Sequence, residues 1–192
     1  ILVPAAEHAG PVPAGLFLAD RLEPTPEDVA FIKRLAGVEI PTREEMHEIE
    51  PSSRLYREGL ALFMTASVLN NTDTPRPETR AVTFIVVEGL LITVRHASPL
   101  PFQSFIHRIL SHPGLVSSAD MALVELLDAI VDRLADTLET VEGHFSTVSQ
   151  QVFAANDRAG HDAPDYVEAL KSIGLNAIRC AKVDESLVGL SR

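Results

Sequence analysis

A heptad pattern of apolar residues in the second half of the chain constrains the fold more than any other feature. Between residues 120 and 153, apolar side chains recur at alternating steps of four and three. The residues of this seam are Leu127, Val131, Leu134, Leu138, Val141, Phe145, Val148 and Val152. Such a repeat places one continuous apolar stripe on a long helix. We therefore expect a helix over residues 119–154 that packs against partner helices through these side chains.

A stripe of carboxylates lies on one flank of the same predicted helix. Its members are Glu125, Asp128, Asp132, Glu139 and Glu142. Like charges at helical spacing repel one another, so this helix is weakened unless cations neutralise the acids. Two interpretations stay open: an ordinary solvated face, or a face that meets partner helices and cations.

A second long helix is expected over residues 164–192, after a connection that contains Gly160 and Pro164. Its apolar positions are Tyr166, Leu170, Ile173, Ala177, Cys180 and Leu187. Two long helices joined by a short connection predict an antiparallel hairpin. A shorter helix is expected before them, over residues 101–111.

The first hundred residues mix strand and helix signals. Strands are expected at 15–22, 54–57, 60–69 and 80–95, and residues 70–78 read as a polar loop. The last of these segments is a hairpin that turns at Glu88 and Gly89. The predicted fold class is α+β: an α/β sandwich with a mixed sheet over residues 1–115, followed by a long antiparallel helical hairpin over residues 116–192.

Two capping patterns predict where the early helices begin. Thr25 is followed by Pro26 and then by Asp28, which places an N-cap, a proline at the first helical position and an acid at the third. This helix is expected to end at Gly37. A capping box over residues 42–45 opens a second, short helix that runs to about residue 50.

Charge and cysteine content narrow the class of protein. The 27 acids and 16 bases give a net charge of −11, which disfavours nucleic acid as a partner because phosphate binding needs a basic surface. The single cysteine, Cys180, excludes an internal disulfide. No uncharged apolar run reaches the length of a membrane span. The motifs GxGxxG, GxSxG and HExxH are missing, so we expect no enzyme activity.

Carboxylates are the side chains most suited to a ligand. Glu44, Glu45, Glu48 and Glu50 crowd one short segment, with His47 among them. Glu45 suits a capping box with Thr42, which is a structural role. The alternative is a hydrated Mg²⁺ site, since that ion keeps its waters and needs only one or two carboxylates, often from separate elements.

Several segments resemble the N-terminal cytoplasmic domain of the CorA-type divalent-cation transporters, nearest to the enterobacterial branch. They are residues 18–25, 40–56, 82–85, 91–95, 127–132, 173–179 and 186–187. The segment 40–56 is the most specific, and the resemblance covers nearly the whole chain. One departure is Leu18, which stands where the family often has tryptophan or another large residue.

The resemblance implies a CorA soluble-domain-like fold and an ion-sensing, gating role at the cytoplasmic face of the bacterial inner membrane. It implies that the full-length parent is a pentamer that transports Mg²⁺ and Co²⁺ through membrane helices lying beyond this chain. Regulatory Mg²⁺ is implied between protomers. By alignment Glu45 matches an interfacial acidic ligand, with Glu44 beside it, and Asp128 and Asp132 are the next candidates.

Two alternative functions remain at this point. One is the equivalent domain of a ZntB-like zinc transporter, in which case the transported ion is Zn²⁺ and not Mg²⁺ or Co²⁺. The other is a helical adaptor without a metal role, for which the acidic stripe is only a solvated face. We expect the chain to be a piece of a longer protein. The isolated piece is expected to be a monomer or a weak dimer.

Overall fold

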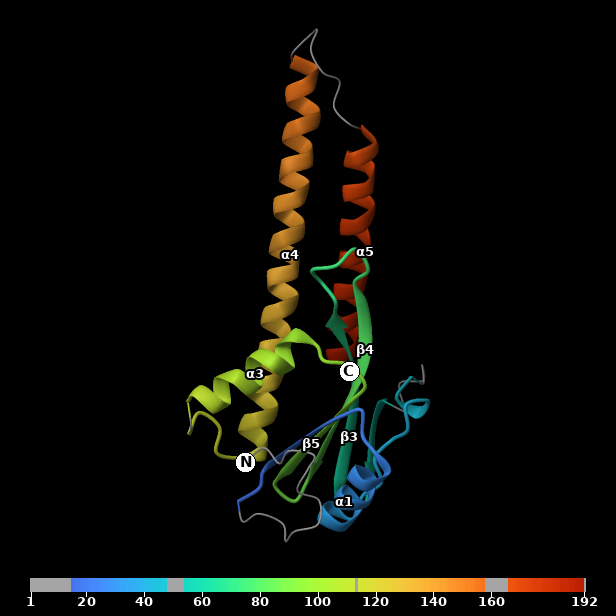
Figure 1. Cartoon of the computed structure of the whole chain (residues 1–192), viewed down its shortest axis with the longest axis vertical. Coiled ribbons are helices and arrows are strands. Elements are labelled where there is room, and N and C mark those ends of the chain that lie inside the picture. Colours follow the sequence, from blue (N-terminus) through green and yellow to red (C-terminus); the bar gives the residue numbers. More distant parts are fainter. Residues whose placement is uncertain (1–14, 48–53, 113, 158–165, 192) are drawn as a thin grey trace.

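The computed structural model describes residues 15–47, 54–112, 114–157 and 166–191. A five-stranded sheet forms the base of the molecule, and two long helices lie side by side and extend away from it (Figure 1). None of the described helices combines the length and the apolar composition needed to cross a membrane.

The sheet is mixed. Its strands are β1 (Leu18–Leu22), β2 (Leu55–Glu58), β3 (Ala61–Asn70), β4 (Glu78–Val87) and β5 (Leu90–Arg95). They lie in the order β1-β5-β4-β3-β2, with β1 parallel to β5 and all other neighbours antiparallel. The turn at Glu88 and Gly89 joins β4 to β5, and both residues adopt positive φ there, as a tight hairpin turn requires.

The helices begin and end where local chemistry directs. They are α1 (Pro26–Ala36), the 3-10 turn η1 (Glu45–His47), α3 (Leu100–Ser111), α4 (Ala119–Asp157) and α5 (Tyr166–Leu190). Thr25 caps α1 in a reciprocal box with Asp28, and Gly37 ends it at a φ of 68° with its N–H bonded to the Lys33 carbonyl oxygen.

Strand alternation divides the core into two layers, one on each face of the sheet. On one face Phe84 packs with Phe102 of α3 and with Leu126 and Ile130 of α4. On the other face the α1 residues Phe31 and Ile32 and the η1 residue Met46 pack on Phe63, Ile85 and Ile92. The first layer includes residues on both sides of position 115, where the predicted sandwich ends, so the first half of α4 shares a core with the sheet.

The predicted fold class is confirmed: a mixed sheet with helices on it, followed by an antiparallel pair of long helices. The short helix predicted over residues 42–50 is a 3-10 turn within the described residues. Its remaining positions, Glu48 and Glu50 included, lie outside them.

Three of the eight positions in the predicted packing seam of α4 are not buried within the chain. Val131, Leu138 and Phe145 are exposed by 48%, 42% and 38%. The buried face lies beside the predicted one, at Ala122, Leu126, Ile130, Leu134, Thr137 and Val141. These steps are mostly of four residues, because the first half of α4 packs across α3 and the sheet and not along a single supercoiled partner.

Most of the predicted seam of α5 is likewise not buried within the chain. Tyr166, Leu170, Ile173 and Leu187 are all exposed by 40% or more, whereas the buried side chains are Asn176, Val183 and Ser186. Apolar residues therefore face outward on both long helices, and much of the inner face of α5 is small or polar.

Candidate functional site

Glu45 is exposed and takes part in the predicted capping box. Its Oε2 accepts from the Thr42 backbone N–H at 2.7 Å and from the Thr42 hydroxyl at 3.0 Å. Its own N–H donates to the Thr42 hydroxyl oxygen at 3.3 Å. One carboxylate oxygen thus holds the start of η1, which is the structural role considered from the sequence. Glu44 is exposed beside it.

Asp128 and Asp132 are exposed on α4, as is Glu142. Glu125, the first acid of the predicted stripe, is different because it forms an ion pair with Arg108 of α3. Asp132 lines a small cavity of about 160 Å³ together with Asp136, Arg108 and Arg133. The two guanidinium groups partly balance the acids there, so this end of the stripe is less negative than the sequence suggests.

The four candidate ligands do not come together within one chain. Met46, next to Glu45, packs in the core layer on the α1 side of the sheet, whereas α4 covers the opposite face. Within the part of the chain that the structure describes, no three His, Cys, Asp or Glu side chains lie close enough to hold a metal ion. A site that uses both pairs of acids therefore requires more than one copy.

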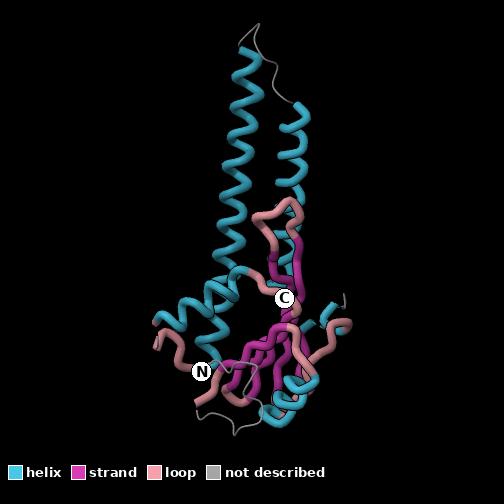
Figure 2. Tube along the Cα trace, in the orientation of Figure 1, coloured by secondary structure: helices cyan, strands magenta, loops and turns pink. Residues whose placement is uncertain are grey.

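The β3–β4 hairpin joins the sheet to both long helices. It rises from the sheet and runs along the helix pair (Figures 1 and 2). Arg133 of α4 donates from Nη2 to both carboxylate oxygens of Asp73, at 2.9 and 3.0 Å, and also to Thr72. The Thr79 hydroxyl donates to Oε1 of Glu185 on α5 at 2.7 Å. One hairpin thus contacts α4 through its tip and α5 through its second strand.

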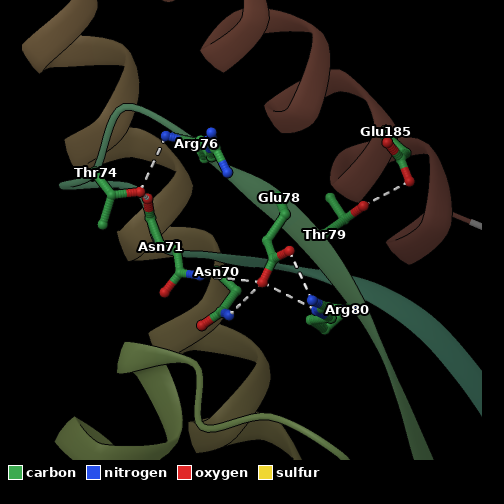
Figure 3. Close-up of polar contacts among 8 residues, drawn as sticks. All are labelled: Asn70, Asn71, Thr74, Arg76, Glu78, Thr79, Arg80 and Glu185. Atoms are coloured by element: carbon green, nitrogen blue, oxygen red, sulfur yellow. Dashed lines mark hydrogen bonds and ion pairs between the residues drawn. The ribbon is translucent and has the colours of Figure 1, made fainter.

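Side chains within the hairpin fix the shape of its tip (Figure 3). Glu78 accepts from the amides of Asn70 and Asn71 at 3.1 Å each, and from Nε and Nη2 of Arg80 at 3.0 and 2.7 Å. The Thr74 hydroxyl donates to the Asn71 carbonyl oxygen at 2.9 Å. Because its carboxylate is fully engaged, Glu78 serves to order the tip and is a poor candidate for an ion ligand.

The last turns of α5 lie against the middle of β3. Ser186 is fully buried, and its hydroxyl donates to the Ser67 carbonyl oxygen at 2.6 Å. A Cβ placed on Gly189 would lie 3.3 Å from the backbone nitrogen of Ser67. Small side chains at both positions therefore let the helix approach the strand closely.

A buried amide joins α4 to α5 further along. Asn176 is 1% exposed, and its Oδ1 lies 3.2 Å from Nδ1 of His144 on α4. The same oxygen accepts from Nη1 of Arg179 at 3.1 Å. Sliding of α5 along α4 would separate Asn176 from His144 and leave it only its partner on the same helix, so this contact favours one register of the two helices.

Two ionisable groups are perturbed near these elements. Burial alone raises the pKa of Glu185, but hydrogen bonds from Lys182 and Thr79 and the charges of Lys182 and Arg54 hold it below its usual value. Burial lowers the pKa of His96 at the end of β5, and Arg43 and His47 lower it further against the opposing effect of Glu23 and Glu44. Residues in and just before η1 thus contribute to the pKa of His96 in opposite directions.

The hairpin contacts were not predicted from the sequence, where residues 70–78 read only as a polar loop. Arg133 and Asp73 are 60 positions apart, and Thr79 and Glu185 are 106 apart. The one sequence signal for these contacts was the high density of polar residues within the loop itself.

Comparison with known proteins gives one family. A family model described as CorA-like Mg²⁺ transporter protein matches residues 19–163. The magnesium transport protein CorA of Wolinella succinogenes is 27% identical over 124 residues, which is 62% of this chain and 39% of that protein. The protein of the same name from Campylobacter jejuni strain RM1221 is 26% identical over 170 residues, or 84% and 50% of the two chains.

The chain spans about half or less of the length of these curated relatives. Among solved structures, full-length CmaX matches with a TM-score of 0.67 at 14% identity, over 98% of this chain and 56% of that chain. The ZntB cytoplasmic domain from Vibrio parahaemolyticus matches with a TM-score of 0.50 at 11% identity, over 91% and 84%. At these identities the likeness is one of fold. The resemblance predicted from the sequence segments is confirmed.

Proposed function

The chain belongs to the CorA-like Mg²⁺ transporter family, and on that premise we propose that it forms the cytoplasmic, ion-sensing part of a divalent metal cation transporter. The match of the family model to residues 19–163 carries this proposal. The parent protein moves the ion across the bacterial inner membrane, and this chain regulates it without enzyme activity.

Mg²⁺ is the proposed transported ion, because the relatives matched in sequence are named magnesium transport proteins. Co²⁺ is the proposed second substrate. The fold likeness to a ZntB domain favours Zn²⁺ as the alternative. Uptake of each ion by the full-length protein, measured in cells that lack other transporters for it, separates these ions.

The positions of the four acids support sensing between copies. Glu44 and Glu45 lie on one side of the sheet, and Asp128 and Asp132 lie on the helix that covers the other side. A ring of copies, which we propose to be a pentamer, can place the first pair of one copy opposite the second pair of its neighbour. Bare acids then repel across each interface, and a divalent ion between them attracts both.

Removal of the ion therefore loosens the ring in this proposal. The hairpin that joins the sheet to α4 and α5 carries the change within each copy, since Asp73, Thr79 and Ser67 are tied to those helices. Each bond is local, and together they give the two helices one defined position relative to the sheet.

The test compares MgCl₂ with NaCl at matched ionic strength on the isolated chain. A ligand that binds only the assembled native state raises stability as the logarithm of its concentration, whereas screening depends on ionic strength alone. We expect MgCl₂ to raise both the melting temperature and the sedimentation coefficient beyond the NaCl values. Equal effects of the two salts would refute ion sensing by this chain.

Variants assign the effect to residues. Glu44→Gln with Glu45→Gln, and separately Asp128→Asn with Asp132→Asn, are expected to abolish the excess effect of MgCl₂. Glutamine at position 45 still serves in the capping box, so the fold at η1 is kept. The control is Glu142→Gln, on the exposed face of α4. Glu78→Gln is unsuitable as a control because Glu78 orders the hairpin tip. Unchanged Mg²⁺ dependence in both double variants would refute the proposed ligands.

A further inference from the structure

An apolar cavity of about 570 Å³ lies between the sheet, α4 and the end of α5. Its lining is Leu55, Met64, Ala66, Phe84, Leu123, Leu127 and Leu190, with Arg54, Thr65 and Gly189. The volume falls within the range of about 300–1,000 Å³ that is typical of small-molecule pockets. No role in ion sensing uses this cavity, because its lining holds none of the candidate acids.

The floor of the cavity is part of the core, but its walls are not closed. Phe84 and Ala66 are 2% and 6% exposed, whereas Met64, Leu123 and Leu127 are only partly buried. An apolar hollow of this size in water leaves its lining without contacts, which disfavours the empty state. Chemistry of the lining therefore indicates a largely hydrocarbon occupant.

The polar part of the lining is at one end. Arg54 precedes β2 and, among the described residues that line the cavity, is the one charged side chain. Its charge also reaches Glu185, which is itself held by Lys182 and Thr79. A guanidinium carries five N–H donors, so Arg54 can donate to a further anion while it keeps its present partners. A guanidinium at the mouth of an apolar cavity complements a carboxylate head on an apolar chain.

We propose that this cavity binds a long-chain carboxylate, with the chain against Met64 and Leu127 and the head at Arg54. The bound chain would contact Leu190 and Gly189, in the turn of α5 that lies against Ser67. Ligand at this position fills the space between the end of α5 and α4, so it stabilises the docked position of the helix. The hydrocarbon chain of the ligand is uncharged where it meets the cavity floor, and the ligand leaves the outer face of α4 uncovered.

The first test measures binding of octanoate, decanoate and dodecanoate to the chain by isothermal titration calorimetry, below the concentrations at which they form micelles. Burial of one methylene contributes about 0.8 kcal/mol, so affinity is expected to rise by up to about fourfold per added methylene. One saturable site per chain is expected for dodecanoate. Absence of saturable binding, or an affinity that does not depend on chain length, would overturn the proposal.

The second test closes the cavity from inside. Ala66→Phe places a ring into it from β3, and Leu123→Trp does so from α4. Both are expected to abolish dodecanoate binding while urea unfolding and circular dichroism stay native-like. Ala177→Phe, on the exposed surface of α5, is the matched control and is expected to bind like the unchanged chain. Equal dodecanoate binding by the closed-cavity variants would show that detergent-like adsorption was measured, and would overturn the site.

The third test concerns the head group. Arg54→Gln is expected to weaken dodecanoate binding about tenfold, since a hydrogen bond to a charged group contributes about 1.5–3 kcal/mol. Arg57→Gln, three positions further on the exposed β2 strand, is the control and is expected to leave it unchanged. Dodecanol should bind both variants equally. If instead the cavity lies against a second copy, the Ala66→Phe chain will lose self-association and dodecanoate will not bind, which also overturns the proposal.

Discussion

A pair of leucines on α4 tests which face of this helix is buried. Leu134 and Leu138 belong to the same heptad seam in the sequence, but Leu134 is 2% exposed and Leu138 is 42% exposed. Leu134 packs with Leu69 of β3 and Val183 of α5 in a small buried cluster. Leu→Ala changes helix propensity equally little at both positions. Any difference between the two variants therefore reports burial.

The magnitude follows from the packing. Leu134→Ala removes three buried carbon atoms, each worth roughly 0.8 kcal/mol of transfer free energy, and leaves a cavity, so we expect a loss of about 2–5 kcal/mol in the free energy of unfolding. At this chain length the melting temperature should fall by roughly 5–15 °C. Leu138→Ala should lose less than about 1 kcal/mol.

The assay is urea unfolding followed by circular dichroism, at two protein concentrations. Two concentrations are needed because Leu138 lies on an exposed apolar stripe, and self-association through that stripe would add a concentration-dependent term to its stability. Equal losses in both variants, at low concentration, would refute the orientation of α4. A larger loss for Leu138→Ala would place the Leu138 side of α4 against the core.

Three further predictions concern polar groups. Asp20→Ala should lower the free energy of unfolding, measured by urea titration, by about 3–5 kcal/mol. The reason is that Arg95 is buried and loses the carboxylate that holds it through two contacts at 2.6 and 2.9 Å. Glu39→Gln, which breaks an exposed ion pair, is the control and should cause no measurable change. Arg133→Met should increase hydrogen exchange about tenfold or more at residues 71–77 and lower global stability by only about 1 kcal/mol, because Asp73 is 83% exposed; unchanged exchange at the tip would contradict the role of this ion pair. The lowered pKa of His96 means that the folded chain disfavours the protonated ring, so stability is fully present above about pH 6.5 and falls as the pH drops below it; His96→Gln should flatten the stability profile between pH 7 and 5, and an unaltered slope would show that another group titrates.

Local signals in the sequence predicted most of the fold correctly. Thr25 and Asp28 form the expected capping box, and the turn at Glu88 and Gly89 joins β4 to β5. These features depend on neighbours within a few residues, so the sequence carries them directly. The order of strands and the parallel pairing of β1 with β5 depend on long-range contacts.

The faces of the long helices were harder to predict, for a physical reason. A chain with apolar residues on two sides of a helix offers two stripes, and periodicity cannot say which one meets the protein core. On α4 both Leu134 and Val131 fit the heptad, but only Leu134 is buried. On α5 the inner face includes Asn176 and Ser186, which hydrophobicity assigns to the outside.

The candidate ligands were predicted only as residues and not as a site. Glu45 holds Thr42 as its capping-box spacing indicated, and its role toward an ion stays a prediction. The contact of Arg133 with Asp73 joins distant parts of the chain, so no local pattern could reveal it. Polar contacts of this kind depend on the fold being known first.

The outward apolar stripe of α4 and its acids bear on one another. Val131 and Leu138 are exposed next to Asp128 and Asp132, so copies that associate through the stripe bring these acids closer together. Association and binding of a bridging divalent ion are then linked: Mg²⁺ must strengthen association by the same factor by which association strengthens Mg²⁺ binding. Measuring both constants on the isolated chain, with Leu138→Ala to weaken the stripe alone, gives two independent values of that factor. The two values must agree, and their size locates the ion: a factor well above one places it at the interface between copies, whereas a factor of one places it at acids that association does not bring together.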